Sequence, residues 1–145
     1  LKLQPSMRVY EIGTGSGYTT AILANVASEV LSCERYQTLA SQSAERLRQI
    51  GLENARIEWR DGLVPPEGAG QFDRVLVHGV LNEIPRQIGA LIHGAGLIIC
   101  ARADSSGQVH LVSLRRDAAA EDGYETTVIA PCRLTPLVPG KSLPL

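Results

Sequence analysis

The chain has 145 residues, 44% of them hydrophobic, and its 14 basic and 15 acidic side chains leave a formal net charge of −1. This length suits one domain with a single core, and the balanced charge gives no electrostatic reason to expect nucleic acid or a membrane surface as partner. Its three cysteines are odd in number, far apart and without a CxxC pair, which indicates reduced thiols in the cytoplasm and neither a metal site nor a disulfide framework.

The chain begins at Leu1 rather than at a methionine, and only a few residues precede the first expected strand. We therefore expect residues 1–145 to be a single domain that is a fragment of a longer protein. The oligomeric state leaves no signal in the sequence.

The first half of the sequence alternates between strand and helix patterns. β-favouring runs predict strands over residues 7–13, 29–34 and 55–60. Helices are expected over residues 16–27 and 36–50. The first helix carries Tyr18, Ile22 and Val26 at a spacing of four, and Gly51 ends the second as a glycine after a helix commonly does.

The second half continues this rhythm and then changes it. A loop dense in Pro and Gly (61–71) precedes a strand (72–78), a short helix with Pro85 in its first turn, and a strand over 97–101 that the turn "HGAG" introduces. Only residues 102–107 separate this strand from the next one, over residues 108–116. A last strand is expected over residues 124–133.

A parallel crossover needs a dozen or more residues, so the connection at 102–107 predicts an antiparallel hairpin. The expected fold is α/β and Rossmann-like: a doubly wound, seven-stranded, mainly parallel sheet with helices on both faces and an antiparallel edge.

The stretch "EIGTGSGYTTAILA" turns the chain from the first strand into the first helix with three alternating glycines, Gly13, Gly15 and Gly17. A phosphate-binding P-loop is excluded because no lysine follows the glycines. The dinucleotide fingerprint GxGxxG fails at Tyr18, where its third glycine should stand. S-adenosylmethionine, which has no phosphate, needs an open backbone turn and an acid ahead of it, a place that Glu11 occupies.

Acidic residues also follow the next two strands. Glu34 ends the second strand, where an acid can accept hydrogen bonds from ribose hydroxyls, or it is a surface charge at the end of a strand. Asp61 and Gly62 end the third strand, where the carboxylate can accept from an adenine amino group or the pair can be a common turn. Three such strand ends at one sheet edge favour a nucleoside-containing cofactor.

Six segments together resemble the protein-L-isoaspartate O-methyltransferases in order and spacing: "VYEIGTGSGYTTAILA", "VLSCER", "RDG", "FDRVLVHGVLNEIP", "HGAGLIICA" and "PLV". The resemblance covers nearly the whole chain. It implies a class I methyltransferase that uses S-adenosylmethionine to methylate the abnormal carboxylate of isoaspartyl residues in damaged proteins, a protein-repair reaction.

The resemblance also implies which residues hold the cofactor. Those expected around its methionine portion are Glu11, Gly13, Gly15, Ser16 and Gly17. Glu34 would hold the ribose with Arg35 beside it, and Asp61 and Gly62 would meet the adenine. Tyr18 would either shield this pocket or pack the first helix on the sheet.

The chain departs from the family where a small apolar run usually follows the fourth strand, because His78, Leu81 and Asn82 stand there. A methyltransferase with another acceptor is therefore an alternative, and His78 would be its first candidate base, or a hydrogen-bonded structural residue. A cofactor-binding module without catalysis and a nicotinamide-dependent oxidoreductase domain are the remaining alternatives. Methylation of a carboxylate needs no dedicated base, since that nucleophile is already ionised near neutral pH.

Overall fold

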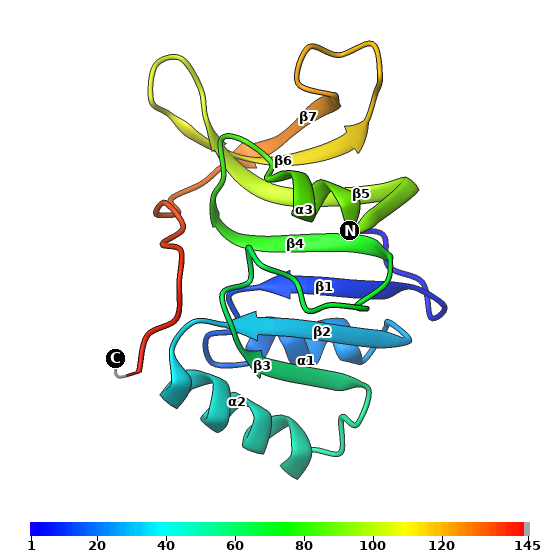
Figure 1. The fold of residues 1–145 in the computed structure, drawn as a ribbon, viewed down its shortest axis with the longest axis vertical. Coiled ribbons are helices and arrows are strands. Elements are labelled where there is room, and N and C mark those ends of the chain that lie inside the picture. Colours follow the sequence, from blue (N-terminus) through cyan, green and yellow to red (C-terminus); the bar gives the residue numbers. More distant parts are fainter. Residues whose placement is uncertain (144–145) are drawn as a thin grey trace.

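The computed structural model describes residues 1–143, in which seven strands form one sheet with the order β3-β2-β1-β4-β5-β6-β7 (Figure 1). The strands are β1 (Arg8–Ile12), β2 (Glu29–Glu34), β3 (Ala55–Trp59), β4 (Phe72–Val80), β5 (Ile92–Ala103), β6 (Val109–Arg116) and β7 (Tyr124–Pro131). The helices in this part of the chain are α1 (Tyr18–Ala24), α2 (Gln37–Gln49) and α3 (Arg86–Ala90).

Strands β1 to β5 pair in parallel, and β6 and β7 are antiparallel additions at one edge. This confirms the predicted fold class, including the hairpin between β5 and β6. The last two residues of the predicted domain, 144 and 145, lie outside the described residues.

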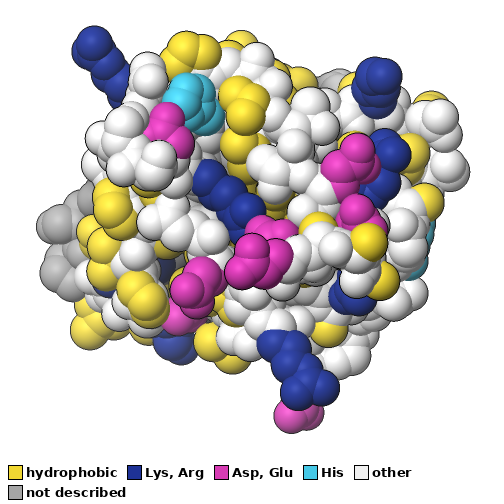
Figure 2. Space-filling model, turned by 90° about the horizontal axis from the view of Figure 1, so that it is seen from above, with side chains coloured by type: hydrophobic (Ala, Val, Ile, Leu, Met, Phe, Trp, Pro, Cys, Tyr) yellow, Lys and Arg dark blue, Asp and Glu magenta, His cyan; other side chains and the backbone are white. Residues whose placement is uncertain are grey.

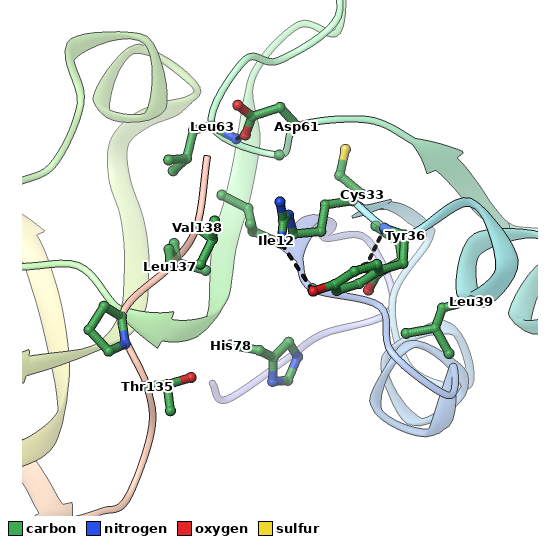
Figure 3. A pocket seen from close by; sticks show the side chains of 15 residues that line it. Ile12, Cys33, Tyr36, Leu39, Asp61, Leu63, His78, Thr135, Leu137 and Val138 are labelled. Atoms are coloured by element: carbon green, nitrogen blue, oxygen red, sulfur yellow. Dashed lines mark hydrogen bonds between the residues drawn. The ribbon is translucent and has the colours of Figure 1, made fainter. Parts of the chain in front are cut away.

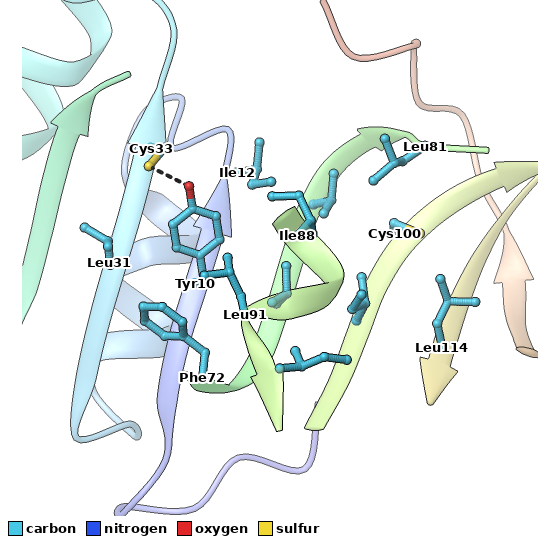
Figure 4. Close-up of a cluster of buried hydrophobic side chains, with 14 of the residues drawn as sticks. Tyr10, Ile12, Leu31, Cys33, Phe72, Leu81, Ile88, Leu91, Cys100 and Leu114 are labelled. Carbon is cyan, nitrogen blue, oxygen red and sulfur yellow. Dashed lines mark hydrogen bonds between the residues drawn. The ribbon is translucent and has the colours of Figure 1, made fainter. Parts of the chain in front are cut away.

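The two faces of the sheet carry separate apolar clusters because successive side chains of a strand point to opposite faces. On the face covered by α3, Tyr10 and Ile12 of β1 join Phe72 and Ile88 in the larger cluster (Figure 4). On the opposite face, Val9 packs with side chains of α1 and its neighbours, which include Leu23, Ala24 and Ala27. With helices on both faces, the sheet has the doubly wound arrangement that its parallel strands require.

Helix α1 has the predicted period, but the predicted face points outward. Tyr18, Ile22 and Val26 are 74%, 50% and 40% exposed, whereas Thr20 and Leu23 are buried against the sheet. The short side chain of Thr20 lets the helix approach β1 closely, and its hydroxyl bonds to a buried carboxylate there. The prediction that this helix spans residues 16–27 was wrong at both ends. Helix α1 begins only after Gly17, which has a positive φ of 85°, and it ends at Ala24.

Strand β5 begins five residues earlier than predicted, so "HGAG" lies within the strand rather than in a turn before it. Phe72 of β4 pairs with Ile92, and the register then shifts before Arg74 pairs with Leu97. Gly96 makes this irregularity possible, because a Cβ there would lie 2.9 Å from Cβ of Ile92. Ile92 is therefore the first residue of the strand.

After β7 the chain runs along the carboxyl ends of the parallel strands, from β4 towards β3 and α2 (red in Figure 1). Isolated bridges tie this segment, residues 134–143, to the sheet at two places: Val80 pairs with Pro136 and Tyr36 with Ser142. We call it the C-terminal segment. Among the described residues, no helix is long and apolar enough to cross a membrane.

Candidate functional site

A cavity of about 290 Å³ opens at the carboxyl edge of the parallel strands (Figure 3). Its walls come from the ends of β1 to β4 and from residues 135–138 of the C-terminal segment. The lining residues are Ile12, Gly13, Cys33, Glu34, Arg35, Tyr36, Leu39, Asp61, Gly62, Leu63, His78, Thr135, Pro136, Leu137 and Val138. This edge is where ligands bind in open α/β sheets.

Most of the residues predicted at strand ends line this cavity. Gly13, Glu34, Arg35, Asp61 and Gly62 are on its wall, and so is the candidate base His78.

The remaining predicted residues lie beside the cavity rather than on its wall. Gly15, Ser16 and Gly17 continue the glycine turn, Tyr18 points to solvent from the start of α1, and Glu11 is completely buried behind the turn. Gly17 is packed against α2, since a Cβ on it would lie 2.9 Å from Cδ1 of Leu47.

The amides of the glycine turn are engaged by the end of β2. The N–H groups of Gly13 and Thr14 donate to the Cys33 carbonyl at 2.8 and 3.3 Å, and the Gly15 N–H donates to Oε2 of Glu34 at 2.8 Å. Gly13, Gly15 and Gly17 all have a positive φ, which gives the turn this shape. The Glu34 carboxylate therefore lies where the amides of a phosphate-binding loop would hold the phosphate.

Glu34 is 5% exposed, and both of its oxygens have a backbone donor. Oε2 accepts from Gly15, and Oε1 accepts from the Tyr36 N–H at 2.9 Å. Because each carboxylate oxygen has two lone pairs, Glu34 retains acceptor capacity towards the cavity. Its position suits a ligand with two neighbouring hydroxyls.

Asp61 links the third strand end to the C-terminal segment. Oδ1 accepts from the Leu63 N–H at 3.0 Å, and Oδ2 accepts from the Gly140 N–H at 2.6 Å. Next to it, Gly62 forms part of the floor, and a Cβ there would lie 2.6 Å from Cγ2 of Ile12. The backbone of β1 and the Asp61 turn can approach each other only because this residue is glycine.

Glu11 is the centre of a polar network at the end of β1. Its Oε2 accepts from the Thr20 hydroxyl at 2.5 Å and from the Ser32 hydroxyl at 2.6 Å, and its Oε1 lies 2.9 Å from Nε2 of His78. A buried carboxylate without such partners would cost several kcal/mol. Of these partners, His78 is the one that also lines the cavity.

Cys33 lies on the cavity wall as a buried thiol. Burial raises its pKa, and the hydroxyl of Tyr10, 3.3 Å from Sγ, partly opposes this shift by hydrogen bonding. Burial, helped by the neighbouring thiol, also raises the pKa of Tyr10, whose hydroxyl donates to the Gly62 carbonyl at 2.9 Å. Both groups are therefore neutral near pH 7 and support the floor rather than take part in proton transfer.

Sequence reasoning did not pick out the apolar and aromatic part of the wall. Tyr36 precedes α2, Leu39 lies in its first turn, and Leu63 follows Asp61. Each is close in sequence to a strand end, and this proximity could have indicated that it lines the cavity. Residues 135–138 carried only the motif "PLV", with no indication that they would close the cavity. Within residues 1–143, no group of three or more histidine, cysteine or carboxylate side chains could hold a metal ion.

Comparison with known proteins identifies relatives over almost the whole chain. Residues 1–142 match the family model described as protein-L-isoaspartate(D-aspartate) O-methyltransferase. A protein-L-isoaspartate O-methyltransferase from Nitrobacter winogradskyi is 39% identical over 140 residues, and "Protein-L-isoaspartate O-methyltransferase 2" from Rhodopseudomonas palustris (strain HaA2) is 36% identical over 140 residues. Each alignment covers 97% of this chain and 63% of the relative, so the chain spans just under two thirds of their length.

Solved structures share the fold. A protein-L-isoaspartate O-methyltransferase superposes with a TM-score of 0.82 at 20% identity, over 94% of this chain and 43% of that one. A putative protein-L-isoaspartate O-methyltransferase from Plasmodium falciparum, in complex with S-adenosyl-L-homocysteine, gives 0.73 at 22% identity over 93% of this chain and 67% of its own.

Proposed function

This chain belongs to the protein-L-isoaspartate O-methyltransferase family, and on that premise we propose that it binds S-adenosylmethionine in the cavity at the sheet edge and methylates isoaspartyl carboxylates of damaged proteins. The observation that carries the proposal is the glycine turn, whose amides bond to the Cys33 carbonyl and to Glu34. A turn occupied in this way repels a pyrophosphate and accepts an uncharged ribose, so it favours this cofactor over a dinucleotide.

Residues at successive positions along the cavity would contact successive parts of the cofactor. Glu34 would accept hydrogen bonds from the ribose hydroxyls, and Asp61 with Gly62 and Leu63 would surround the adenine. Gly13 and the rest of the glycine turn would leave room for the methionine portion. Glu11 acts from behind this turn, because it is completely buried.

When bound, S-adenosylmethionine supplies an electrophilic methyl group on a positively charged sulfur. The chain's contribution would be to orient the two reactants and to exclude water, which can supply several kcal/mol of the rate enhancement. Residues 135–138 roof the cavity and carry no charged side chain, so they would shield the methyl group from solvent. The acceptor carboxylate is already ionised near neutral pH, and no general base is required of His78.

We also propose the methyl acceptor and the cellular location of the protein. A protein or peptide with isoaspartyl residues would be the partner, and three free thiols at Cys33, Cys100 and Cys132 are compatible with a cytoplasmic location. A different methyl acceptor is the second candidate, favoured by the imidazole of His78 on the cavity wall.

Calorimetry with S-adenosylhomocysteine and with NAD tests the cofactor. We expect micromolar binding of the first, typical of a small-molecule site, and no binding of the second. Methyl transfer to an isoaspartyl peptide, measured on the longest chain that the gene encodes, tests the reaction. The same peptide with a normal aspartate is the matched control.

Binding of NAD alone would overturn the proposed cofactor. Cofactor binding with no methyl transfer to the isoaspartyl peptide would overturn the proposed acceptor and leave a methyltransferase of other specificity or a non-catalytic binding module.

A further inference from the structure

Glu11 and His78 form a pair that joins a completely buried carboxylate to the wall of the cavity. Glu11 is 0% exposed, and 33% of the His78 side chain is accessible. The two residues are 67 positions apart in the sequence and meet because β1 and β4 are neighbours in the sheet. The carboxylate itself cannot touch a ligand, so any effect it has on one must pass through His78.

The protons of the network determine which atom His78 presents to the cavity. The hydroxyl of Ser32 donates to Glu11, so the short contact between Ser32 and Thr14 requires Thr14 to donate to Ser32. Thr20 also donates to Glu11, so its Oε2 accepts two hydrogen bonds. Its Oε1 faces Nε2 of His78, and we assign the hydrogen of this contact to the ring.

A neutral imidazole that donates through Nε2 has a lone pair on Nδ1. Among residues 1–143, Nδ1 of His78 has no hydrogen-bond partner. Because the ring lies on the cavity wall and its Nε2 is turned to the Glu11 carboxyl group, Nδ1 is the acceptor left for a ligand, and a cationic donor suits it better than an anion.

His78 lies at the end of the cavity opposite Asp61 (Figure 3) and next to the glycine turn, since a Cβ on Gly13 would lie 3.1 Å from Cβ of His78. If the nucleoside lies between Glu34 and Asp61, the amino-acid end of the cofactor reaches this end. This placement of the cofactor rests on the proposed function.

The other charged groups on the wall do not oppose a cation at this end. Glu34 is acidic, and so is Asp61 at the far end. The guanidinium of Arg35 donates to the Gly140 carbonyl of the C-terminal segment and to the Tyr36 hydroxyl.

We propose that Nδ1 of His78 accepts a hydrogen bond from the α-ammonium group of the cofactor, and that Glu11 is the positioning residue that fixes the ring and its tautomer. His78 then contacts the cofactor rather than acting as a base towards the methyl acceptor.

Two ligands that differ at the amino-acid end test this contact by calorimetry. S-adenosylhomocysteine carries the α-ammonium group, and 5′-methylthioadenosine lacks the whole amino-acid end but keeps the nucleoside and sulfur. His78→Ala should weaken binding of the first about 10- to 100-fold, as expected for a hydrogen bond to a charged group, and leave binding of the second unchanged.

Two further variants separate the roles of the pair. His78→Gln can donate to Glu11 through its amide nitrogen and accept through its amide oxygen, so it should recover most of the affinity for S-adenosylhomocysteine. Glu11→Gln removes the charge and should weaken only this ligand. Thermal unfolding of each variant shows whether it folds.

The matched control is His93→Ala. His93 also bonds to a carboxylate, Oδ1 of Asp73 at 2.8 Å, but both lie at the opposite, amino edge of the parallel strands. Neither ligand should change its affinity in this variant.

The pH dependence of binding gives a second readout. A protonated imidazole cannot accept a hydrogen bond and repels an ammonium group, so lowering the pH should weaken the binding of S-adenosylhomocysteine more than that of 5′-methylthioadenosine. The neighbouring titratable groups are Glu11 on β1, Cys33 and Glu34 on β2, and Asp61 after β3. These groups of the protein surround both ligands, so an effect of their protonation would appear for both. The binding of 5′-methylthioadenosine is therefore the reference.

Equal losses for the two ligands in His78→Ala, or no loss for either, would overturn the inference while leaving the proposed function in place. Failure of the unaltered chain to bind S-adenosylhomocysteine would overturn the proposed function and the inference together.

Discussion

At the scale of single residues, two buried carboxylates set the chemistry of the site. Glu34 is bonded to two backbone amides, and Glu11 to two hydroxyls and an imidazole, so the charge of each is compensated by donors fixed in the fold. Negative charge at the carboxyl edge suits a ligand that carries a cationic sulfur and an ammonium group.

Gly62 allows a close approach that any side chain would prevent. A Cβ at this position would lie 2.6 Å from Cγ2 of Ile12 and 3.2 Å from Cβ of Cys33. We expect Gly62→Ala to lower the free energy of unfolding by about 1–3 kcal/mol, because overpacking moves side chains off their preferred positions. It should also weaken S-adenosylhomocysteine binding at least about tenfold (about 1.4 kcal/mol), since the floor of the cavity moves.

Urea unfolding and calorimetry measure the two effects. The control is Gly94→Ala in β5, where a Cβ would meet nothing within 4 Å and the φ angle is not in the left-handed region. The prediction fails if the two variants are equally stable and bind equally well.

At the scale of elements, the C-terminal segment completes a site that the parallel strands only begin. It is attached by the Gly140 N–H to Asp61, by the Arg35 guanidinium to the Gly140 carbonyl, and by Trp59, whose Nε1 donates to the carbonyls of Arg35 and Ser142 at 2.9 and 3.2 Å. Further backbone hydrogen bonds join the segment to Val80, Arg35 and Gln37. We expect the contacts near its end, at residues 140–142, to open when a ligand enters or leaves.

Trp59→Phe tests this attachment. The ring of Trp59, which faces Lys141 Nζ at 4.5 Å, is largely kept, and only the N–H donor is lost. The two carbonyls keep other donors, so the unfolding free energy should fall by only about 0.5–1.5 kcal/mol. Dissociation of S-adenosylhomocysteine, followed by stopped-flow fluorescence or displacement, should become several times faster.

Lys141→Gln is the comparison variant, because it removes the contact with the ring and keeps the N–H donor. An unchanged dissociation rate in Trp59→Phe would show that the C-terminal segment does not limit ligand release.

At the scale of the whole molecule, charges of both signs are distributed over the surface. On the face at the β7 edge, acidic and basic side chains lie close together rather than in a patch of one sign (Figure 2). Over the surface as a whole, ion pairs include Arg8 with Glu29 and Arg102 with Asp122. Because the net charge is only −1, pH-dependent stability depends on these local partners.

The stability of the fold should fall in acid. Hydrogen bonds from Arg8 and Arg102 lower the pKa values of Glu29 and Asp122. Although partial burial opposes it, the backbone N–H of Arg8 and the ring of His93 lower the pKa of Asp73. Since the folded pKa of each group lies below its unfolded value, its contribution is present above about pH 4 and is lost as the pH falls through the folded value.

Thermal unfolding between pH 6 and pH 3 measures this effect. We expect the midpoint to fall by at least about 5 °C, most of it below pH 4.5. Asp73→Asn should flatten the dependence, and salt near 1 M should reduce the part that comes from exposed pairs. A midpoint that is independent of pH over this range would contradict the prediction.

The local pattern of the sequence is enough to predict the strands, their mainly parallel arrangement with an antiparallel edge, and the strand ends that line the cavity. Strand periodicity and connection length are local properties, so the six residues of 102–107 were enough to predict the β5–β6 hairpin. Glu34 and Asp61 could be placed at the same edge because the carboxyl ends of parallel strands meet there.

The neighbours of these residues, in contrast, come from the tertiary fold. The phase of α1 depends on Thr20 reaching Glu11, and the role of Glu11 depends on His78, 67 positions away. The roof depends on Gly140 meeting Asp61 across 79 positions. Such contacts follow from strand order and packing, which the local pattern of the sequence does not encode. They place Glu11, an acid predicted beside the cofactor, behind His78.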